Sequence, residues 1–137
     1  MSEIKLIRVR DVMKTKFDRV DGITTVADAL HNMQYPEVRA LVVNKRHEND
    51  EFGMLFFKDI ARNILAKDRA PERVNVYEIM VKPALSVRPD MDIRYCARFF
   101  DQFKVLRVPV IEDNEVIGIV GYSDIVLRGM TDKYKFN

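Results

Sequence analysis

The sequence predicts an α/β (α+β) fold built from two similar β-α-β-β-α units, and three observations support this prediction. Residues 9–13 (VRDVM) return 67 positions later as residues 76–80 (VYEIM). Residues 58–60 (KDI) return as residues 123–125 (SDI). In both copies, short apolar strand segments alternate with amphipathic helical segments, an order that gives a sheet covered by helices. Such a duplication implies two units related by a pseudo-two-fold axis, and a cleft on that axis is lined twice by related residues.

The first copy is expected to contain a short helix and strand, a longer helix, a two-stranded hairpin and a final helix. These elements are assigned to residues 12–13, 17–20, 26–35, 40–43, 53–57 and 59–66. Thr25 can cap the longer helix. The apolar stripe of this helix is formed by Val26, Leu30 and Met33. Residues 44–51 are polar and charged, which is typical of a hairpin loop.

The second copy repeats this order. Its elements are assigned to residues 79–80, 85–87, 93–100, 107–111, 116–120 and 124–129. Asp90 can cap the helix that begins at residue 93, and Gly129 can end the last helix. The chain is therefore expected to divide into a first domain, a charged linker, a second domain and a tail, at residues 9–66, 67–75, 76–130 and 131–137.

Composition limits the classes of protein that this chain can represent. A repeat of about 60 residues is marginal as an independent domain, so the two halves are expected to pack on each other. The net charge of +2 gives no indication of a nucleic-acid surface. The apolar stretches are too short to span a membrane, and the N-terminus lacks the core of a signal peptide. The single cysteine, Cys96, fits a reducing compartment, so we expect a cytoplasmic protein without a membrane or nucleic-acid partner.

Two motifs of the second copy, together with the duplicated order of elements, resemble a known family. Residues 107–110 (RVPV) and 118–125 (GIVGYSDI) are similar to the cystathionine-β-synthase (CBS) domain, and two in tandem resemble a Bateman module. The resemblance covers residues 9–130. It implies two units packed through their sheets, with two clefts that often hold AMP, ADP, ATP or S-adenosylmethionine. It also implies a homodimeric, non-catalytic ligand sensor that signals to an attached or separate effector.

The resemblance gives a ligand-binding role to two carboxylates, Asp124 and Asp59. A carboxylate in the first turn of a helix is stabilised by the helix dipole and can accept hydrogen bonds from both hydroxyls of a ribose. The residues expected around Asp124 are Ile119, Gly121, Ser123, Arg107, Val38, Arg39, Met13 and Lys14. The residues expected around Asp59 are Met54, Phe56, Lys58, Arg39, Val105, Leu106 and Met80.

The two sites depart from the family pattern in different ways. The family usually has Ser or Thr three positions before the Asp, whereas this chain has Gly121 in one copy and Phe56 in the other. Gly121 leaves room and free backbone N–H groups for an anion. Phe56 adds bulk and no hydroxyl. We therefore expect one usable site, at Asp124, and one degraded or closed site, at Asp59.

The leading hypothesis is a stand-alone CBS pair that binds an adenine nucleotide and signals to an unidentified separate partner. The main alternative is a ligand-free dimeric interaction scaffold. A nucleotide-transforming enzyme and a nucleic-acid-binding protein are further alternatives. His31 and His47 have no metal-ligand spacing, and no catalytic triad or Gly-rich phosphate loop is present. We accordingly expect no catalytic residues, no metal and no required cofactor.

Overall fold

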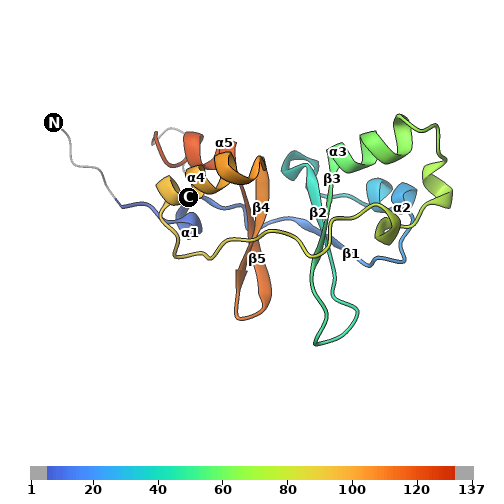
Figure 1. The fold of residues 1–137 in the computed structure, drawn as a ribbon, viewed down its shortest axis with the longest axis horizontal. Coiled ribbons are helices and arrows are strands. Elements are labelled where there is room, and N and C mark those ends of the chain that lie inside the picture. The colour runs from blue at the N-terminus through green and yellow to red at the C-terminus, as the bar shows by residue number, and fades with distance from the viewer. Residues whose placement is uncertain (1–5, 132–137) are drawn as a thin grey trace. The chain divides into compact units, whose positions relative to one another are not determined.

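The computed structural model describes residues 6–131, which form two compact units (Figure 1). The first, the 16–84 unit, is continuous in sequence. The second, here called the 85–131 unit, also contains residues 6–15. Both combine helices with a small sheet, so the mixed α/β class that the sequence predicted is confirmed. Of the predicted tail, residues 132–137 lie outside the described residues.

The 16–84 unit contains a three-stranded sheet in the order β1-β2-β3, with β1 parallel to β2 and β2 antiparallel to β3. The strands are β1 (Asp18–Val20), β2 (Ala40–Val43) and β3 (Gly53–Phe56). The helices and helical turns are α2 (Val26–His31), η1 (Pro36–Val38), α3 (Phe57–Ile60), η2 (Ala61–Leu65), η3 (Pro71–Arg73) and η4 (Val76–Glu78). Every residue of β2 is buried, as its wholly apolar sequence requires of a central strand.

The core of the 16–84 unit forms where β2 and β3 meet the helices. Leu41 and Leu55 are fully buried at its centre, against Val26 and Ala29 of α2. Thr25 caps α2, because its hydroxyl accepts a hydrogen bond from the N–H of Asp28 at 3.1 Å. Val26 and Met33 of the predicted stripe contact the core, but Ala29 is buried in place of Leu30, which is 39% exposed.

The 85–131 unit is built on the hairpin of β4 (Arg107–Glu112) and β5 (Glu115–Gly121). Asp113 and Asn114 both have positive φ, 52° and 63°, as the tight turn between these strands requires. The helices are α1 (Val9–Val12), α4 (Ile93–Phe103) and α5 (Tyr122–Leu127). The strand predicted at 85–87 is reduced to a single parallel bridge between Val87 and Val110.

The cap of α4 differs from the prediction. Asp92, not Asp90, is the N-cap residue, and its carboxylate accepts a hydrogen bond from the N–H of Arg94 at 2.8 Å. The carbonyl of Asp90 instead accepts a hydrogen bond from the Arg8 guanidinium. Asp90 and Asp92 are equally suitable as caps in the local sequence. The contact between Asp90 and Arg8 joins residues far apart in the chain, so the sequence does not indicate it.

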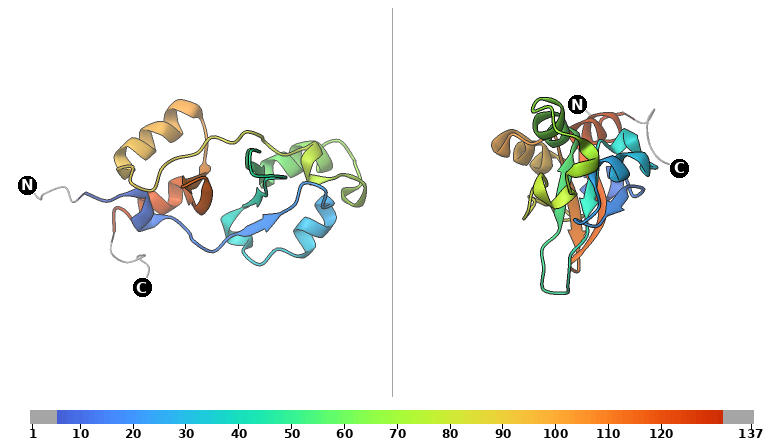
Figure 2. Two further views of the ribbon diagram at one scale, coloured as in Figure 1. Left: turned by 90° about the horizontal axis from the view of Figure 1, so that it is seen from below. Right: turned by 90° about the vertical axis from the view of Figure 1, so that its right-hand side faces the viewer.

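The leading segment of each sequence copy packs with the other copy. The N–H of Val9 in α1 donates to the carbonyl of Met91 at 2.8 Å, and α1 lies beside α5 (Figure 2). Conversely, the N–H of Val76 in η4 donates to the carbonyl of Thr24 at 2.8 Å. Each compact unit is therefore assembled from both halves of the sequence.

Candidate ligand-binding site

Asp124 is a buried carboxylate in the first turn of α5. Its side chain is only 5% exposed. Oδ2 accepts a hydrogen bond from the backbone N–H of Gly121 at 2.8 Å, which satisfies the first donor of the helix. Oδ1 forms an ion pair with the ammonium group of Lys14, which lies 110 positions earlier in the chain. The carboxylate is thus fixed by one local and one distant partner.

Lys14 reaches Asp124 because the segment after α1 pairs with β5. The backbone of Lys14 exchanges two hydrogen bonds with Ile119, of 2.8 and 2.9 Å. Gly118 permits this approach: a Cβ atom at this position would lie 2.6 Å from Sδ of Met13 and 2.9 Å from the Lys14 carbonyl oxygen. The structure therefore brings Met13 and Lys14 of the first copy together with the Asp124 motif of the second.

Arg107 and Ser123 complete the part of the site in the 85–131 unit. Arg107 is paired with Gly121 across β4 and β5 and is half-buried. Ser123 is exposed on the first turn of α5, and Ile119 is buried in β5. A Cβ atom at Gly121 would meet its nearest neighbours at 3.4–3.6 Å, an ordinary contact distance. The position that usually carries a hydroxyl in the family therefore has space for a side chain.

A second arginine lies close to this site. Arg128 of the turn after α5 donates from Nη1 to the carbonyl of Val12 at 3.1 Å, which ties α5 to the end of α1. Burial lowers the pKa of Arg128 from its usual value, and the charge of Asp124 partly opposes this shift. Sequence reasoning missed Arg128 because its contact with α1 joins the two ends of the chain.

Asp59 occupies the equivalent position in α3 and is equally buried, at 5% exposure. Oδ2 accepts a hydrogen bond from the Phe56 N–H at 3.1 Å. Met54 and Val81 exchange backbone hydrogen bonds of 2.9 and 2.8 Å, as Ile119 and Lys14 do in the other unit. Val81 thus stands in the place of Lys14. Within residues 6–131, no ion pair reaches Asp59.

Val38, Arg39 and Lys58 lie in the 16–84 unit with Asp59, whereas Val105 and Leu106, which were expected around Asp59, lie in the 85–131 unit. Arg39 follows η1 with a positive φ of 63°, and its carbonyl accepts the N–H of Phe57 at 3.3 Å, next to the start of α3. Val38 is buried, whereas Arg39 and Lys58 are exposed. Val38 and Arg39 were also expected to line the Asp124 cleft. Since they and Asp124 belong to different units, this stays a prediction.

Neither a metal-binding cluster nor a membrane-spanning helix is found among the described residues. Between residues 6 and 131, no group of His, Cys, Asp and Glu side chains is arranged to hold a metal ion. In the same part of the chain, no helix has the length and apolar character needed to cross a membrane. The Asp124 site offers a buried carboxylate that accepts hydrogen bonds, with Lys14 and Arg128 near it.

This fold and this site define a CBS-domain protein. The sequence model of the CBS domain family matches residues 9–66 and again residues 76–130, so the chain belongs to this family as a tandem pair. Among curated relatives, the mitochondrial CBS domain-containing protein CBSX3 of Arabidopsis thaliana is 30% identical over 128 residues, covering 86% of this chain. The chain spans 62% of the length of CBSX3. CBS domain-containing protein YhcV of Bacillus subtilis is 27% identical over 91% of this chain and 87% of its own.

Solved structures of other CBS proteins share this fold. A hexameric CBS-CP12 protein from bloom-forming cyanobacteria is 34% identical, with a TM-score of 0.86 over 96% of this chain and 76% of its own. The CBS domain protein TA0289 of Thermoplasma acidophilum is 30% identical, with a TM-score of 0.76 over 88% of this chain and 68% of its own. The CBS domain pair of protein MJ0100, solved in complex with 5′-methylthioadenosine and S-adenosyl-L-methionine, is 21% identical, with a TM-score of 0.72 over 87% of this chain and 96% of its own.

Proposed function

We propose that this CBS pair is a regulatory module that binds an adenine nucleotide at the Asp124 site and signals to a separate effector protein, without catalysing a reaction. The candidate ligands are AMP, ADP, ATP and S-adenosylmethionine. The observation that carries the proposal is the buried Asp124 carboxylate, held at the start of α5 by Gly121 and Lys14. Cytoplasmic location is part of the proposal and is supported by the free, buried Cys96.

The hydrogen-bonding capacity of Asp124 fits a sugar diol. Each carboxylate oxygen can accept about two hydrogen bonds, and each oxygen of Asp124 already has one partner. One acceptor position on each oxygen therefore remains for the 2′- and 3′-hydroxyls of a ribose. Lys14 is 22% exposed, so its ammonium group can also turn to a ligand phosphate. The adenosine-type ligands of the MJ0100 CBS pair, which carry such a ribose, support this choice of ligand class.

Titration calorimetry with the four candidate ligands tests the proposal. We expect saturable binding to the wild-type chain and a loss of about tenfold or more in affinity for Asp124→Asn, since hydrogen bonds to charged groups contribute about 1.5–3 kcal/mol each. Asp59→Asn is the matched control, because it changes the equivalent carboxylate in the other unit. Circular dichroism of both variants checks that they remain folded. A wild-type chain that binds none of these ligands at millimolar concentration would exclude the proposal.

A ligand-free dimeric scaffold is the second candidate function. The surface of the 85–131 unit favours self-association whether or not the protein binds a nucleotide. Several large apolar side chains of α4, α5 and the adjoining turns are about half exposed or more. They are Tyr95, Phe103, Leu106, Tyr122, Val126, Leu127 and Met130. A related CBS protein is described as hexameric. We propose that this surface forms a homodimer contact.

Light scattering after size-exclusion chromatography tests this contact. We expect Val126→Asp to lower the measured mass toward that of a monomer, because it places a charge on the apolar surface. Leu65→Asp is the control, since Leu65 is an exposed apolar residue of the 16–84 unit. A wild-type chain that is monomeric at all concentrations would contradict the dimer. A dimer that persists in Val126→Asp and is lost in Leu65→Asp would place the contact elsewhere.

A further inference from the structure

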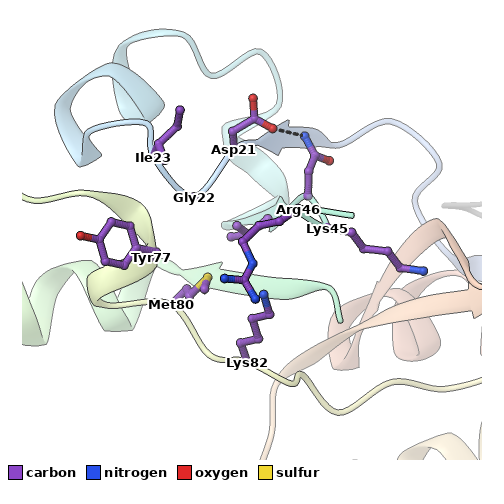
Figure 3. A pocket seen from close by; sticks show the side chains of 10 residues that line it. Asp21, Gly22, Ile23, Lys45, Arg46, Tyr77, Met80 and Lys82 are labelled. Carbon is purple, nitrogen blue, oxygen red and sulfur yellow. Dashed lines mark hydrogen bonds between the residues drawn. The ribbon is translucent and has the colours of Figure 1, made fainter. Parts of the chain in front are cut away.

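The 16–84 unit contains a cavity of about 690 Å³ (Figure 3). It is lined by Asp21, Gly22, Ile23, Val43, Asn44, Lys45, Arg46, Tyr77, Met80 and Lys82. Val43 is the last residue of β2, and the other lining residues follow the ends of the parallel strands β1 and β2 or belong to the segment around η4. Asp59 follows the end of β3, which runs antiparallel to β2. The cavity and Asp59 are therefore at opposite ends of the same sheet.

One side of the cavity is positively charged. Arg46 and Lys82 come from separate segments, and their side chains approach each other beside Met80 in Figure 3. Both bind the carboxylate of Asp50, at 2.9 and 2.8 Å. These two cations hold the pKa of Asp50 well below its usual range, so Asp50 stays ionised and keeps them in place. Lys45 also belongs to the lining, with its ammonium group 4.7 Å from the centre of the Phe52 ring.

The other side of the cavity is apolar and aromatic. Tyr77 lies across from Arg46 and Lys82 in Figure 3 and is 53% exposed. The N–H of Tyr77 donates to the carbonyl of Gly22 at 2.9 Å, which fixes η4 against the turn after β1. A Cβ atom at Gly22 would lie 3.3 Å from Cβ of Tyr77, so a glycine here keeps this wall open. Asn44 and Asp21, joined by a 3.0 Å hydrogen bond, close the polar end.

The other copy of the repeat does not reproduce this chemistry. Asn44 and Ile111 make equivalent backbone hydrogen bonds, to the carbonyls of Val20 and Val87, which aligns the two copies at this point. Counting from there, Glu112 and Asp113 stand in the places of Lys45 and Arg46. In the same way, Arg10 and Thr15 stand in the places of Tyr77 and Lys82. The charge is reversed and the ring is absent, so the cluster is a property of this cavity and not of the repeated fold.

We propose that this cavity binds a small aromatic oxyanion, a carboxylate or a phosphate monoester carried on a flat ring. The Arg46 guanidinium, whose Nε and Nη2 already hold Asp50, and the Lys82 ammonium bind the oxyanion through their remaining N–H donors. The ring packs between Tyr77 and Met80, where aromatic stacking and a thioether contact favour a flat apolar body. This site is separate from Asp124 and does not depend on nucleotide binding there.

Amide-resolved NMR of the whole chain tests the site with phenyl phosphate, benzoate and inorganic phosphate as probes. We expect saturable shifts of the Gly22, Asn44 and Met80 amides with one or both aromatic probes, and weaker binding of inorganic phosphate. A preference for phenyl phosphate or for benzoate identifies the anionic group. Absence of saturable shifts with both aromatic probes at millimolar concentration would overturn the proposal.

Single substitutions distinguish binding in this cavity from binding at Asp124. Lys82→Gln and Arg46→Gln are each expected to weaken the aromatic probe about tenfold, because each removes a charged hydrogen-bond donor. Arg88→Gln is the matched control, since Arg88 forms an exposed ion pair with Asp90 in the other unit. Tyr77→Leu is expected to weaken phenyl phosphate and leave inorganic phosphate unchanged. Binding that is lost in Asp124→Asn but kept in Lys82→Gln would show that the probe sits in the nucleotide site and would overturn the proposal.

Discussion

At the scale of single residues, the two copies differ most in the partner of the buried carboxylate. Asp124 has Lys14, and Asp59 has Val81 in the equivalent place. Removing one member of a partly buried ion pair leaves the other charge without compensation. The ion pair is therefore expected to affect stability as well as ligand binding.

Lys14→Met is expected to lower the free energy of unfolding by about 1–3 kcal/mol, less than for a fully buried pair because Lys14 is partly exposed. Urea unfolding of Lys14→Met, Asp124→Asn and the double variant measures the coupling between the two residues. The double variant should lose less stability than the two single losses together. Strictly additive losses would show that the pair contributes no interaction of its own.

Asp92 gives a pH-dependent contribution to the same unit. The Arg94 guanidinium lowers the pKa of Asp92 to about 2, against about 3.9 in an unfolded chain. Since the folded-state pKa is the lower one, the stability gained from this charge is fully present above about pH 4 and is lost as the pH falls toward 2. Asp92→Asn keeps the cap but removes the charge. The stability difference between wild type and Asp92→Asn should therefore shrink between pH 4 and pH 2, and a difference that is constant with pH would contradict this role of the charge.

At the scale of elements, α5 begins without a side-chain cap. Gly121 is its N-cap residue, with an ordinary φ of −116°, and has room for a side chain. Gly121→Ser should add a hydroxyl cap and raise the free energy of unfolding by a few tenths of a kcal/mol. Gly118→Ala is the contrasting variant, since its Cβ would collide with Met13 and Lys14 and displace the segment that carries the lysine. Thermal unfolding should rank Gly121→Ser above wild type and Gly118→Ala below it. A destabilised Gly121→Ser would mean that the site has less space than the distances indicate.

At the scale of the whole molecule, the exchange of leading segments makes the sequence repeats incomplete on their own. A fragment of residues 76–130 lacks α1, whose backbone bonds to Pro89 and Met91. A fragment of residues 9–66 lacks η4 and with it the buried Val76 and Ile79. We expect each fragment alone to be largely unfolded by circular dichroism and a mixture of the two to regain structure. Two fragments that fold separately would show that the exchanged segments are dispensable.

The sequence was sufficient for the fold class and for the positions of Asp124 and Asp59, because both depend on local patterns that occur twice. It did not indicate the Lys14–Asp124 ion pair as such, since the two residues are brought together only by the pairing of the segment after α1 with β5. The cap of α4 was assigned to Asp90 because Asp90 and Asp92 are alike in local sequence. The cavity of the 16–84 unit was missed because its cations come from a hairpin loop and from the segment after η4, and no periodic pattern links them.

The interlaced path of the chain bears on how such a protein could arise. A polypeptide of half this length would complete its hydrophobic core only by trading its first helix with a second molecule, so its folding would depend on concentration. Joining two such molecules end to end converts that encounter into an intramolecular one, governed by an effective concentration instead of the cellular one. Once joined, the halves are free to diverge, and one carboxylate can keep a lysine where the other has a valine.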